Sequence, residues 1–406
     1  MNSRERVAAA MRHETPDRVP VMCQLALGHY FLHSRFEPAE IWFDSEVFVR
    51  TLSEFQQRYR FDGFLINVPG RPADWRHWLR GQRRESGRQV LTWADGFVTT
   101  FPPDDNGHTT LADGSDLPRA DPAHVDPADP ATYRLPGYVW NTWHAPTLFD
   151  LPADADLTDP AAYPEWLTLG LRLARVACPD VSVHMEVFSP LTHLLELFGY
   201  QPALMAMLDV PPLCHRLLEQ FTRMVVAMVC CYGPHQADAI LISSAFAGAG
   251  FISRDMYREF VVPYERRVVE AIHQFGIPAY THTCGAIGDR LDLMADTGLD
   301  GIDTLDPPPL GTVDLARAKA EFGSRLFFKG NLDAVNEMLY ADDARFRQAA
   351  LDRLRIGQPG SGYILSSACS VAPRVPPQRL RLLAELAEEY GTFPAIPRGQ
   401  AVAGNA

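Results

Sequence analysis

The sequence predicts an α/β protein built as a (β/α)8 TIM-type barrel with an N-terminal helical extension and an Asp/Pro-rich insertion. Three observations lead to this fold. Short strand-like runs alternate with long amphipathic runs, which is typical of βα units on a parallel sheet. The strand-like runs number about eight, as the common closed barrel requires. The chain has 406 residues, of which 47% are apolar, so it can bury one large core.

Each expected strand is followed by Gly, Pro or polar residues and then by an amphipathic stretch. The expected strands are VPVMCQL from Val19, DGFLINV from Asp62, SVHMEVF from Ser182, DAILISS from Asp238, PAYTHTC from Pro278, GIDTLD from Gly301, RLFFKGN from Arg325 and GYILSSA from Gly362. The stretch 253–276 is an example of such an amphipathic run, with Ser253 as an expected N-cap and Gly276 just beyond the helix end. We expect residues 1–396 to form one barrel domain and 397–406 a disordered tail.

A long insert, at about residues 85–160, separates the second and third strands. It contains QVLTWADGFVTTF (89–101), which predicts a β-hairpin. From 103 to 160 it holds 11 Asp, 2 Arg and no Glu or Lys, a local charge of -9. Polar, Pro-rich stretches usually form solvated surface excursions, and this is our expectation. The alternative is a lid over the barrel mouth, for which the aromatic side chains would be Tyr138, Trp140, Trp143 and His144.

Charge and cysteine usage limit the functional classes. Lys plus Arg number 37 against 50 Asp plus Glu, and the net charge of -13 disfavours nucleic acid and anionic membrane surfaces as partners. We see neither a signal-peptide core nor an apolar run of about 20 residues, so we expect a cytoplasmic, soluble protein. Seven cysteines in such a chain do not form a disulfide scaffold. Four lie in apolar helix-like text and are interpreted as packing residues: Cys178, Cys214, Cys230 and Cys231.

Polar residues gather at the ends of the expected strands. A barrel of this type forms its active site from the carboxyl ends of its strands and the loops after them. The residues at those ends are Gln24, Asn67, Glu186, Ser243, Ser244, His282, Cys284, Asp303, Asp306, Asn331, Asp333 and Cys369. We expect their side chains to converge on one barrel mouth.

Three of these residues are typical zinc ligands. His282 and Cys284 lie two positions apart, so they face the same side of an extended strand. Gly285 allows the backbone to turn sharply next to them. Cys369 ends the last strand, which lies three strand positions away across a narrow mouth. The set predicts one zinc ion held by nitrogen and sulfur; the alternative is two buried cysteines and a hydrogen-bonded histidine without metal.

Three protein ligands with an open fourth position are the pattern of a catalytic zinc site. Two thiolates make the ion better suited to binding another thiolate than to forming hydroxide from water. A coordinated thiol is deprotonated and becomes nucleophilic. The residues therefore predict activation of a small thiol for attack on an alkyl group. Asp306, with Asp303 next, is the candidate for a fourth ligand at rest, although both could equally cap the loop before Pro307.

Five segments outside the insert match the pattern of a known superfamily. They are RERVAAAMRHETPDRVPV near the N-terminus, then ISRDMYREFVVPYERRVVEAIHQFGIPAYTHTCG, LDGIDTLDPP, FFKGNLDAVNEML and GYILSSACSVAPRVPPQRLRLLAELAEEYG. On these segments the sequence resembles the uroporphyrinogen decarboxylase superfamily over most of its length outside the insert. It implies a (β/α)8 barrel.

Two branches of that superfamily differ after the first strand. The decarboxylases carry an Arg-rich M-R-Q-A-G-R loop that binds substrate carboxylates without metal, whereas this chain has MCQLALGHYFLH there, with Gln24. The other branch comprises zinc-dependent methyltransferases that use methylcorrinoids, such as the methanol- and methylamine-pathway coenzyme M methyltransferases. Their motif is a H-x-C after one strand and a Cys near the C-terminus, which His282, Cys284 and Cys369 match.

This resemblance implies transfer of a methyl group between a corrinoid (cobalamin) and a small thiol, leaving Co(I). A related branch demethylates methoxy or methylamine compounds onto Co(I), so the direction of transfer stays open. The corrinoid is expected as a co-substrate, carried by a separate protein or free, and the chain could form a homodimer. A metal-free decarboxylase or lyase, and a binding or activating subunit without catalysis, are the competing hypotheses.

Other residues are expected to shape the substrate end. Glu186 and His184 lie on one strand face and could act as acid and base or orient an ammonium group, although Glu186 could instead pair with a neighbouring donor. Asp303 is a third candidate for a catalytic role. Asn331 and Asp333, together with Gln24, are expected to make polar contacts with the cofactor at the mouth.

Overall fold

A parallel sheet of seven strands forms the centre of the protein. The structure, a computed structural model, describes residues 1–68, 70–133 and 155–393. The strand order is β1-β6-β7-β8-β9-β10-β11, with every neighbouring pair parallel. These strands are β1 (Gly63–Ile66), β6 (Ser182–Phe188), β7 (Ala239–Ser243), β8 (Ala279–His282), β9 (Gly301–Asp303), β10 (Phe327–Leu332) and β11 (Tyr363–Ser367). The predicted α/β barrel architecture is confirmed, with the first strand as an exception.

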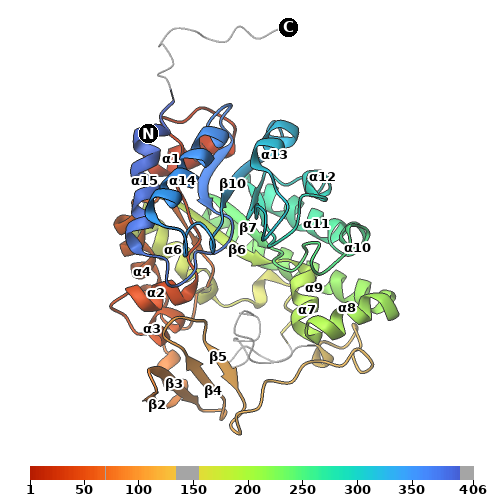
Figure 1. The fold of residues 1–406 in the computed structure, drawn as a ribbon. Helices are drawn as coiled ribbons and strands as arrows, with labels where there is room; N and C mark the ends of the chain where they lie inside the picture. Colours follow the sequence, from red (N-terminus) through yellow and green to blue (C-terminus); the bar gives the residue numbers. More distant parts are fainter. Residues whose placement is uncertain (69, 134–154, 394–406) are drawn as a thin grey trace.

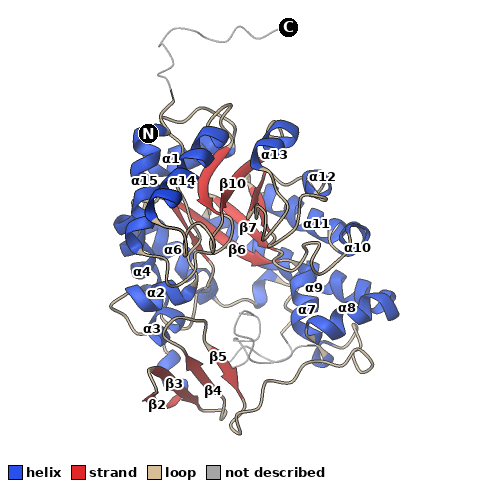
Figure 2. Cartoon of the chain, viewed as in Figure 1, coloured by secondary structure: helices blue, strands red, loops and turns tan. Residues whose placement is uncertain are grey.

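The helices surround the central strands (Figure 2). They are α1 (Ser3–Met11), α2 (Leu27–His33), α3 (Pro38–Phe43), α4 (Ser45–Tyr59), α6 (Leu169–Ala177), α7 (Pro190–Phe198), α8 (Tyr200–Asp209), α9 (Pro211–Tyr232), α10 (Arg254–Phe260), α11 (Val262–His273), α12 (Leu291–Asp296), α13 (Leu315–Phe322), α14 (Asp343–Gly357) and α15 (Pro377–Tyr390). The stretch 253–276 begins as expected, because the Ser253 side chain accepts from the Met256 amide. It forms two helices, however, since Pro263 at the start of α11 has no amide hydrogen to continue α10. No helix in the described ranges is both long and apolar enough to cross a membrane.

The expected first strand does not form a regular ladder. Residues 19–25 make isolated bridges only, one of which pairs Val21 with Leu365 of β11. Pro20 has no amide hydrogen, and the Val21 amide donates instead to the Asp62 carboxylate at 2.8 Å. On the other side, the Asp62 amide donates to the Val21 carbonyl at 2.7 Å. The segment therefore closes the gap between β11 and β1 with few bonds, because proline and a side chain replace ladder partners.

Helix α1 closes the amino-terminal end of the barrel. Three of its apolar side chains, each at most 5% exposed, belong to one cluster with side chains from the strands and from the segment 19–25. The cluster consists of Val7, Ala10 and Met11 of α1 with Met22, Leu65, Ala239, Leu241, Tyr280, Phe327 and Ile364. Burial of these side chains fills the amino-terminal end of the barrel interior, and active sites of this fold lie at the opposite end, where the strands have their carboxyl ends.

The first part of the insert forms an antiparallel sheet of four strands, which projects from one end of the molecule while α1 lies at the other (Figure 1). The strands are β2 (Leu79–Glu85), β3 (Arg88–Trp93), β4 (Val98–Phe101) and β5 (His108–Thr110). The predicted hairpin is confirmed as the β3–β4 pair.

One face of this sheet packs against the core, whereas the Asp/Pro-rich tract, for which we expect a solvated excursion, is mostly exposed or partly exposed over its described residues 103–133. Trp93 and Phe101 are buried, and both rings contact Phe43 of α3. The insert therefore extends the core on one side, because its hairpin has an apolar face. The residues suggested for a lid, Tyr138, Trp140, Trp143 and His144, and the tail 397–406 lie outside the described residues.

Candidate metal centre and its cavity

The side chains of His282, Cys284 and Cys369 meet at the carboxyl ends of the strands. Their ligand atoms all lie within 4.8 Å of one another. The Cys284 Sγ is 3.5 Å from the His282 Nε2 and 3.6 Å from the Cys369 Sγ, and the Cys369 Sγ is 4.0 Å from the same nitrogen. A tetrahedral zinc ion with ordinary bond lengths separates its nitrogen and sulfur ligands by roughly 3.6–3.8 Å. The donor set therefore fits zinc in both type and spacing.

The local backbone explains why the three groups converge. His282 is the last residue of β8, and the Cys284 amide donates to the Ala245 carbonyl beyond β7. Gly285 follows with φ of 78°, a conformation that favours glycine and turns the chain away from the site. Gly248 lies against Cys284, since a Cβ atom there would be 2.4 Å from the Cys284 carbonyl oxygen. The cysteine is thus placed by a turn packed tightly against the neighbouring loop.

The ring of His282 is oriented by a buried carboxylate. The His282 Nδ1 lies 3.3 Å from the Asp303 Oδ2, in the strand next to it, so Nε2 is left for the cysteines. The Lys329 Nζ donates to the same oxygen at 3.0 Å. Burial opposes ionisation of Asp303, but Lys329 and His282 hold its pKa below its ordinary value. A carboxylate behind a histidine in this way sets the tautomer of a metal ligand.

The cluster attracts positive charge. Burial alone would lower the pKa of His282, but hydrogen bonds and charge from Asp303 and Cys369 outweigh it and raise the pKa to about 10. The hydrogen bond from Cys284 lowers the pKa of Cys369 and raises that of Cys284 itself. The cluster then holds two protons, one on the histidine and one between the sulfurs. A divalent cation could replace both protons without a change in the net charge.

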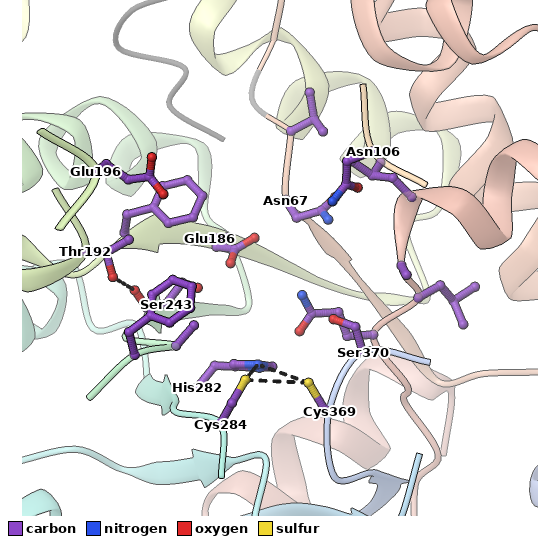
Figure 3. Close-up of a pocket in the computed structure, with 18 of the residues that line it drawn as sticks. Asn67, Asn106, Glu186, Thr192, Glu196, Ser243, His282, Cys284, Cys369 and Ser370 are labelled. Atoms are coloured by element: carbon purple, nitrogen blue, oxygen red, sulfur yellow. Dashed lines mark hydrogen bonds between the residues drawn. The ribbon is translucent and has the colours of Figure 1, made fainter. Parts of the chain in front are cut away.

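A cavity of about 390 Å³ opens above this cluster (Figure 3). Its size is typical of a site for a small molecule. Its lining includes the three cluster residues, polar side chains and an apolar wall. The other residues that line it are Gln24, Leu25, Ala26, Leu27, Trp42, Asn67, Val68, Asn106, Glu186, Phe188, Thr192, Glu196, Tyr200, Ser243, Ala245, Phe246 and Ser370.

Glu186 and His184 occupy different depths of the barrel. Glu186 lines the cavity, and burial raises the pKa of its carboxyl to about 7. His184 lies below the cavity, completely buried, with its ring nitrogens bound to Tyr280 and Ser182. Burial lowers the pKa of His184 to about 3, so its ring is neutral. The expectation that both act at the site therefore fails for His184, because the side chain two residues along the strand points to a deeper layer.

Three other predicted residues make hydrogen bonds to the surrounding protein and do not line the cavity. The Asp306 Oδ2 accepts the Gly285 amide at 2.7 Å, and its carboxylate is not part of the cluster of ligand atoms. Asn331 bridges Leu305 and Arg353. Asp333 accepts the amides of Val335 and Asn336, as a cap does. None of the three lines the cavity, whereas Gln24 does.

Two residues near the site, Lys329 and Glu196, are not among those predicted from the sequence. Lys329 is in the centre of a buried strand, where a lysine is rare without a partner, and that position was a usable signal. Glu196 comes from α7 and not from a strand end, so the strand pattern contained no sign of it.

Comparison with known proteins agrees with the fold. Two uroporphyrinogen decarboxylases, from Nitrosococcus oceani and Cellvibrio japonicus, are 30% identical over 197 residues and 31% identical over 190 residues. The alignments cover 46% and 45% of this chain and 52% and 51% of those proteins, so the chain spans about half the length of the curated relatives it matches. A solved structure of a methyltransferase from Methanosarcina mazei superposes with a TM-score of 0.69 at 15% identity, over 96% of this chain and 99% of that one. That likeness shows the fold.

The family model described as "Uroporphyrinogen decarboxylase (URO-D)" matches residues 152–390, which include β6 to β11 and all three residues of the His/Cys cluster. The match covers more than half of the chain, and the chain therefore belongs to the uroporphyrinogen decarboxylase (URO-D) family.

Proposed function

We propose that this protein is a zinc-dependent methyltransferase that moves a methyl group between a corrinoid and a small thiol. The observation that carries the proposal is the cluster of His282 Nε2 and the two sulfurs of Cys284 and Cys369 within 4.8 Å, below a cavity that a small molecule can enter. The set has three ligands and faces open space, as catalytic zinc sites do.

The residues divide the work between them. His282 and the two cysteines would hold the ion, and Asp303 would keep the His282 ring in its orientation. Bound there, Zn²⁺ would lower the pKa of an incoming thiol, so that its sulfur is presented as a thiolate. The cavity walls would hold the thiol in place and limit the access of water to it.

In the thiol-methylating direction, the thiol first releases its proton to solvent. Its sulfur then attacks the methyl carbon of the methylcorrinoid. The carbon–sulfur bond would form as the cobalt–carbon bond breaks, and the electron pair of that bond would stay on cobalt, taking it from Co(III) to Co(I). In the reverse direction the methyl group of a small molecule would be transferred to Co(I), with the same bonds and electron pair exchanged in the opposite order. In either case the corrinoid supplies the demanding chemistry and the protein supplies the positioning.

A metal-free decarboxylase is the second candidate, because the curated relatives carry that name. A porphyrinogen with four or more carboxylates needs several cations at its site. Among the residues that the structure describes, the lining of the cavity includes neither Arg nor Lys. This lining favours the methyltransferase.

Metal analysis with a turnover assay tests the proposal. We expect about one zinc per chain in protein grown with zinc, and loss of most of it in Cys284→Ser and Cys369→Ser. Cys214→Ser, a buried cysteine on α9, is the matched control and should keep its zinc. Zinc-loaded protein should demethylate methylcobalamin in the presence of a thiol, and the two serine variants should not. Folded protein that binds no zinc, or turnover that persists in both variants, would overturn the proposal.

A further inference from the structure

The cavity is lined by hydrogen-bond acceptors that receive no donor from the described parts of the chain. The Gln24 Oε1 and the Asn67 Oδ1 are buried and have no hydrogen-bond partner among the residues that the structure describes. Glu186 points into the cavity above the His/Cys cluster, with Asn67 on the opposite side (Figure 3). Buried acceptors without partners cost free energy, so a ligand that displaces water from this cavity is favoured if it supplies N–H or O–H groups.

Glu186 can supply a negative charge to this cavity: burial raises its pKa to about 7, and an ammonium group beside it would favour the ionised form. Glu186 makes no hydrogen bond or ion pair at normal distances within the described parts of the chain, and the Ser243 hydroxyl lies close enough to affect its ionisation. The other lining carboxylate, Glu196, is already neutralised by Arg119, whose Nη1 is 3.1 Å away. Arg71 stacks on the Trp42 ring at 5.6 Å and is not itself a lining residue. Among the described residues of the lining, Glu186 is thus the carboxyl left to pair with a cationic group of a ligand.

We propose that the small thiol carries an ammonium group, with its sulfur at the cluster of His282, Cys284 and Cys369 and its N–H donors directed at Glu186. The inference rests on the proposed function, because it assumes that the cluster receives a sulfur atom. It adds the chemical class of the substrate: an amino-thiol, or its methyl thioether in the reverse direction.

Other thiols fit this cavity less well. A sulfonate or carboxylate would bring a second negative charge beside Glu186 in a site with an apolar remainder, including Phe188 and Phe246. A neutral alkyl thiol would leave the acceptors of Gln24 and Asn67 without partners. A protonated amine provides up to three donors and the opposite charge, and charged hydrogen bonds are the stronger kind.

Three thiols with the same two-carbon chain separate these cases. The binding of 2-aminoethanethiol, 2-mercaptoethanol and 2-mercaptoethanesulfonate to zinc-loaded protein is measured by calorimetry. We expect 2-aminoethanethiol to bind at least about tenfold more tightly than 2-mercaptoethanol, and the sulfonate to bind most weakly. Glu186→Gln, which keeps the shape and removes the charge, should abolish most of the advantage of the amine.

The control variant is Glu388→Gln, because Glu388 is a carboxylate on the surface helix α15 paired with Arg60. It should keep the full preference, and zinc content is measured in every variant. An amine advantage that persists in Glu186→Gln would mean that the amine chelates zinc, and would overturn the inference. Equal binding of the three thiols, or tightest binding of the sulfonate, overturns it too but leaves the thiol site standing. Failure of all three thiols to bind overturns the proposed function together with the inference.

Discussion

The Lys329 ammonium group donates to the Asp303 carboxylate inside the barrel, at 3.0 Å, and each side chain is no more than 2% exposed. The same carboxylate oxygen lies 3.3 Å from the His282 ring. A chain of contacts thus runs from a buried lysine to a residue of the His/Cys cluster. The pair neutralises a carboxylate that would otherwise be isolated in the barrel interior.

Replacement of Lys329 should be costly for stability. Lys329→Met leaves the Asp303 charge buried without its cation, and we expect the free energy of unfolding to fall by about 3–5 kcal/mol. Arg317→Met is the matched control, because it breaks an exposed helical ion pair with Glu321 that should contribute little to stability. Urea denaturation of both variants measures the difference. Similar small decreases in the free energy of unfolding of the two variants would show that the buried pair stabilises the protein no more than the exposed pair.

Asp303 should govern metal affinity more than Asp306 does. Asp303→Asn removes the carboxylate behind His282, and we expect zinc affinity to fall about 10- to 100-fold. Asp306→Asn should change it much less, because the Asp306 carboxylate accepts the Gly285 amide instead. Competition with a chromophoric chelator measures both.

The double variant Asp303→Asn with Lys329→Met removes both buried charges together and leaves neither without a partner. It therefore separates the effect on zinc affinity from a loss of stability. Its zinc affinity should stay low. If Asp306→Asn loses zinc as completely as Cys284→Ser, then Asp306 is a ligand and our placement of it is wrong.

The turn next to Cys284 should be sensitive to a single methyl group. A Cβ atom at Gly248 would be 2.4 Å from the Cys284 carbonyl oxygen, so Gly248→Ala must displace one of the two loops. We expect a loss of about 1–3 kcal/mol in stability and weaker zinc binding. Gly250→Ala is the control, because its added Cβ would have no described atom within 4 Å other than those of its chain neighbours. Equal zinc affinity in both variants would contradict this role of the turn.

Stability should fall in acid through the buried His184. Burial lowers the pKa of His184 in the folded protein to about 3, against about 6.5 when unfolded. Between those values the unfolded chain binds a proton that the folded protein does not, so the unfolding free energy falls as pH falls. The slope from this residue is about 1.4 kcal/mol per pH unit at most.

The measurement compares wild type with His184→Gln, both stripped of metal by a chelator, at several pH values between 6.5 and 3. The variant should show a smaller acid dependence, because it has lost one titrating group. Parallel curves for the two proteins would mean that His184 does not contribute.

Local patterns were sufficient for much of the fold and for the centre of the site. The alternation of strand-like and helix-like runs predicts the parallel sheet, since each strand has the apolar sequence of a buried element. The strand-end rule predicted that His282, Cys284 and Cys369 would meet, and the structure brings their ligand atoms within 4.8 Å. Both rest on short-range regularities: the period of a strand and the order of strands around a barrel.

The sequence by itself therefore determined the barrel and the residues at its mouth, because periodicity and strand order are written along the chain. Only the tertiary structure decided which polar side chains reach the cavity. It directed Glu186 into the cavity and His184 into the core, although they share a strand face, since depth along the barrel axis is not encoded in the period. It also assigned Lys329 to Asp303 and gave the Asp306 carboxylate to a backbone amide, because a hydrogen-bond partner depends on distances between segments that are far apart in sequence.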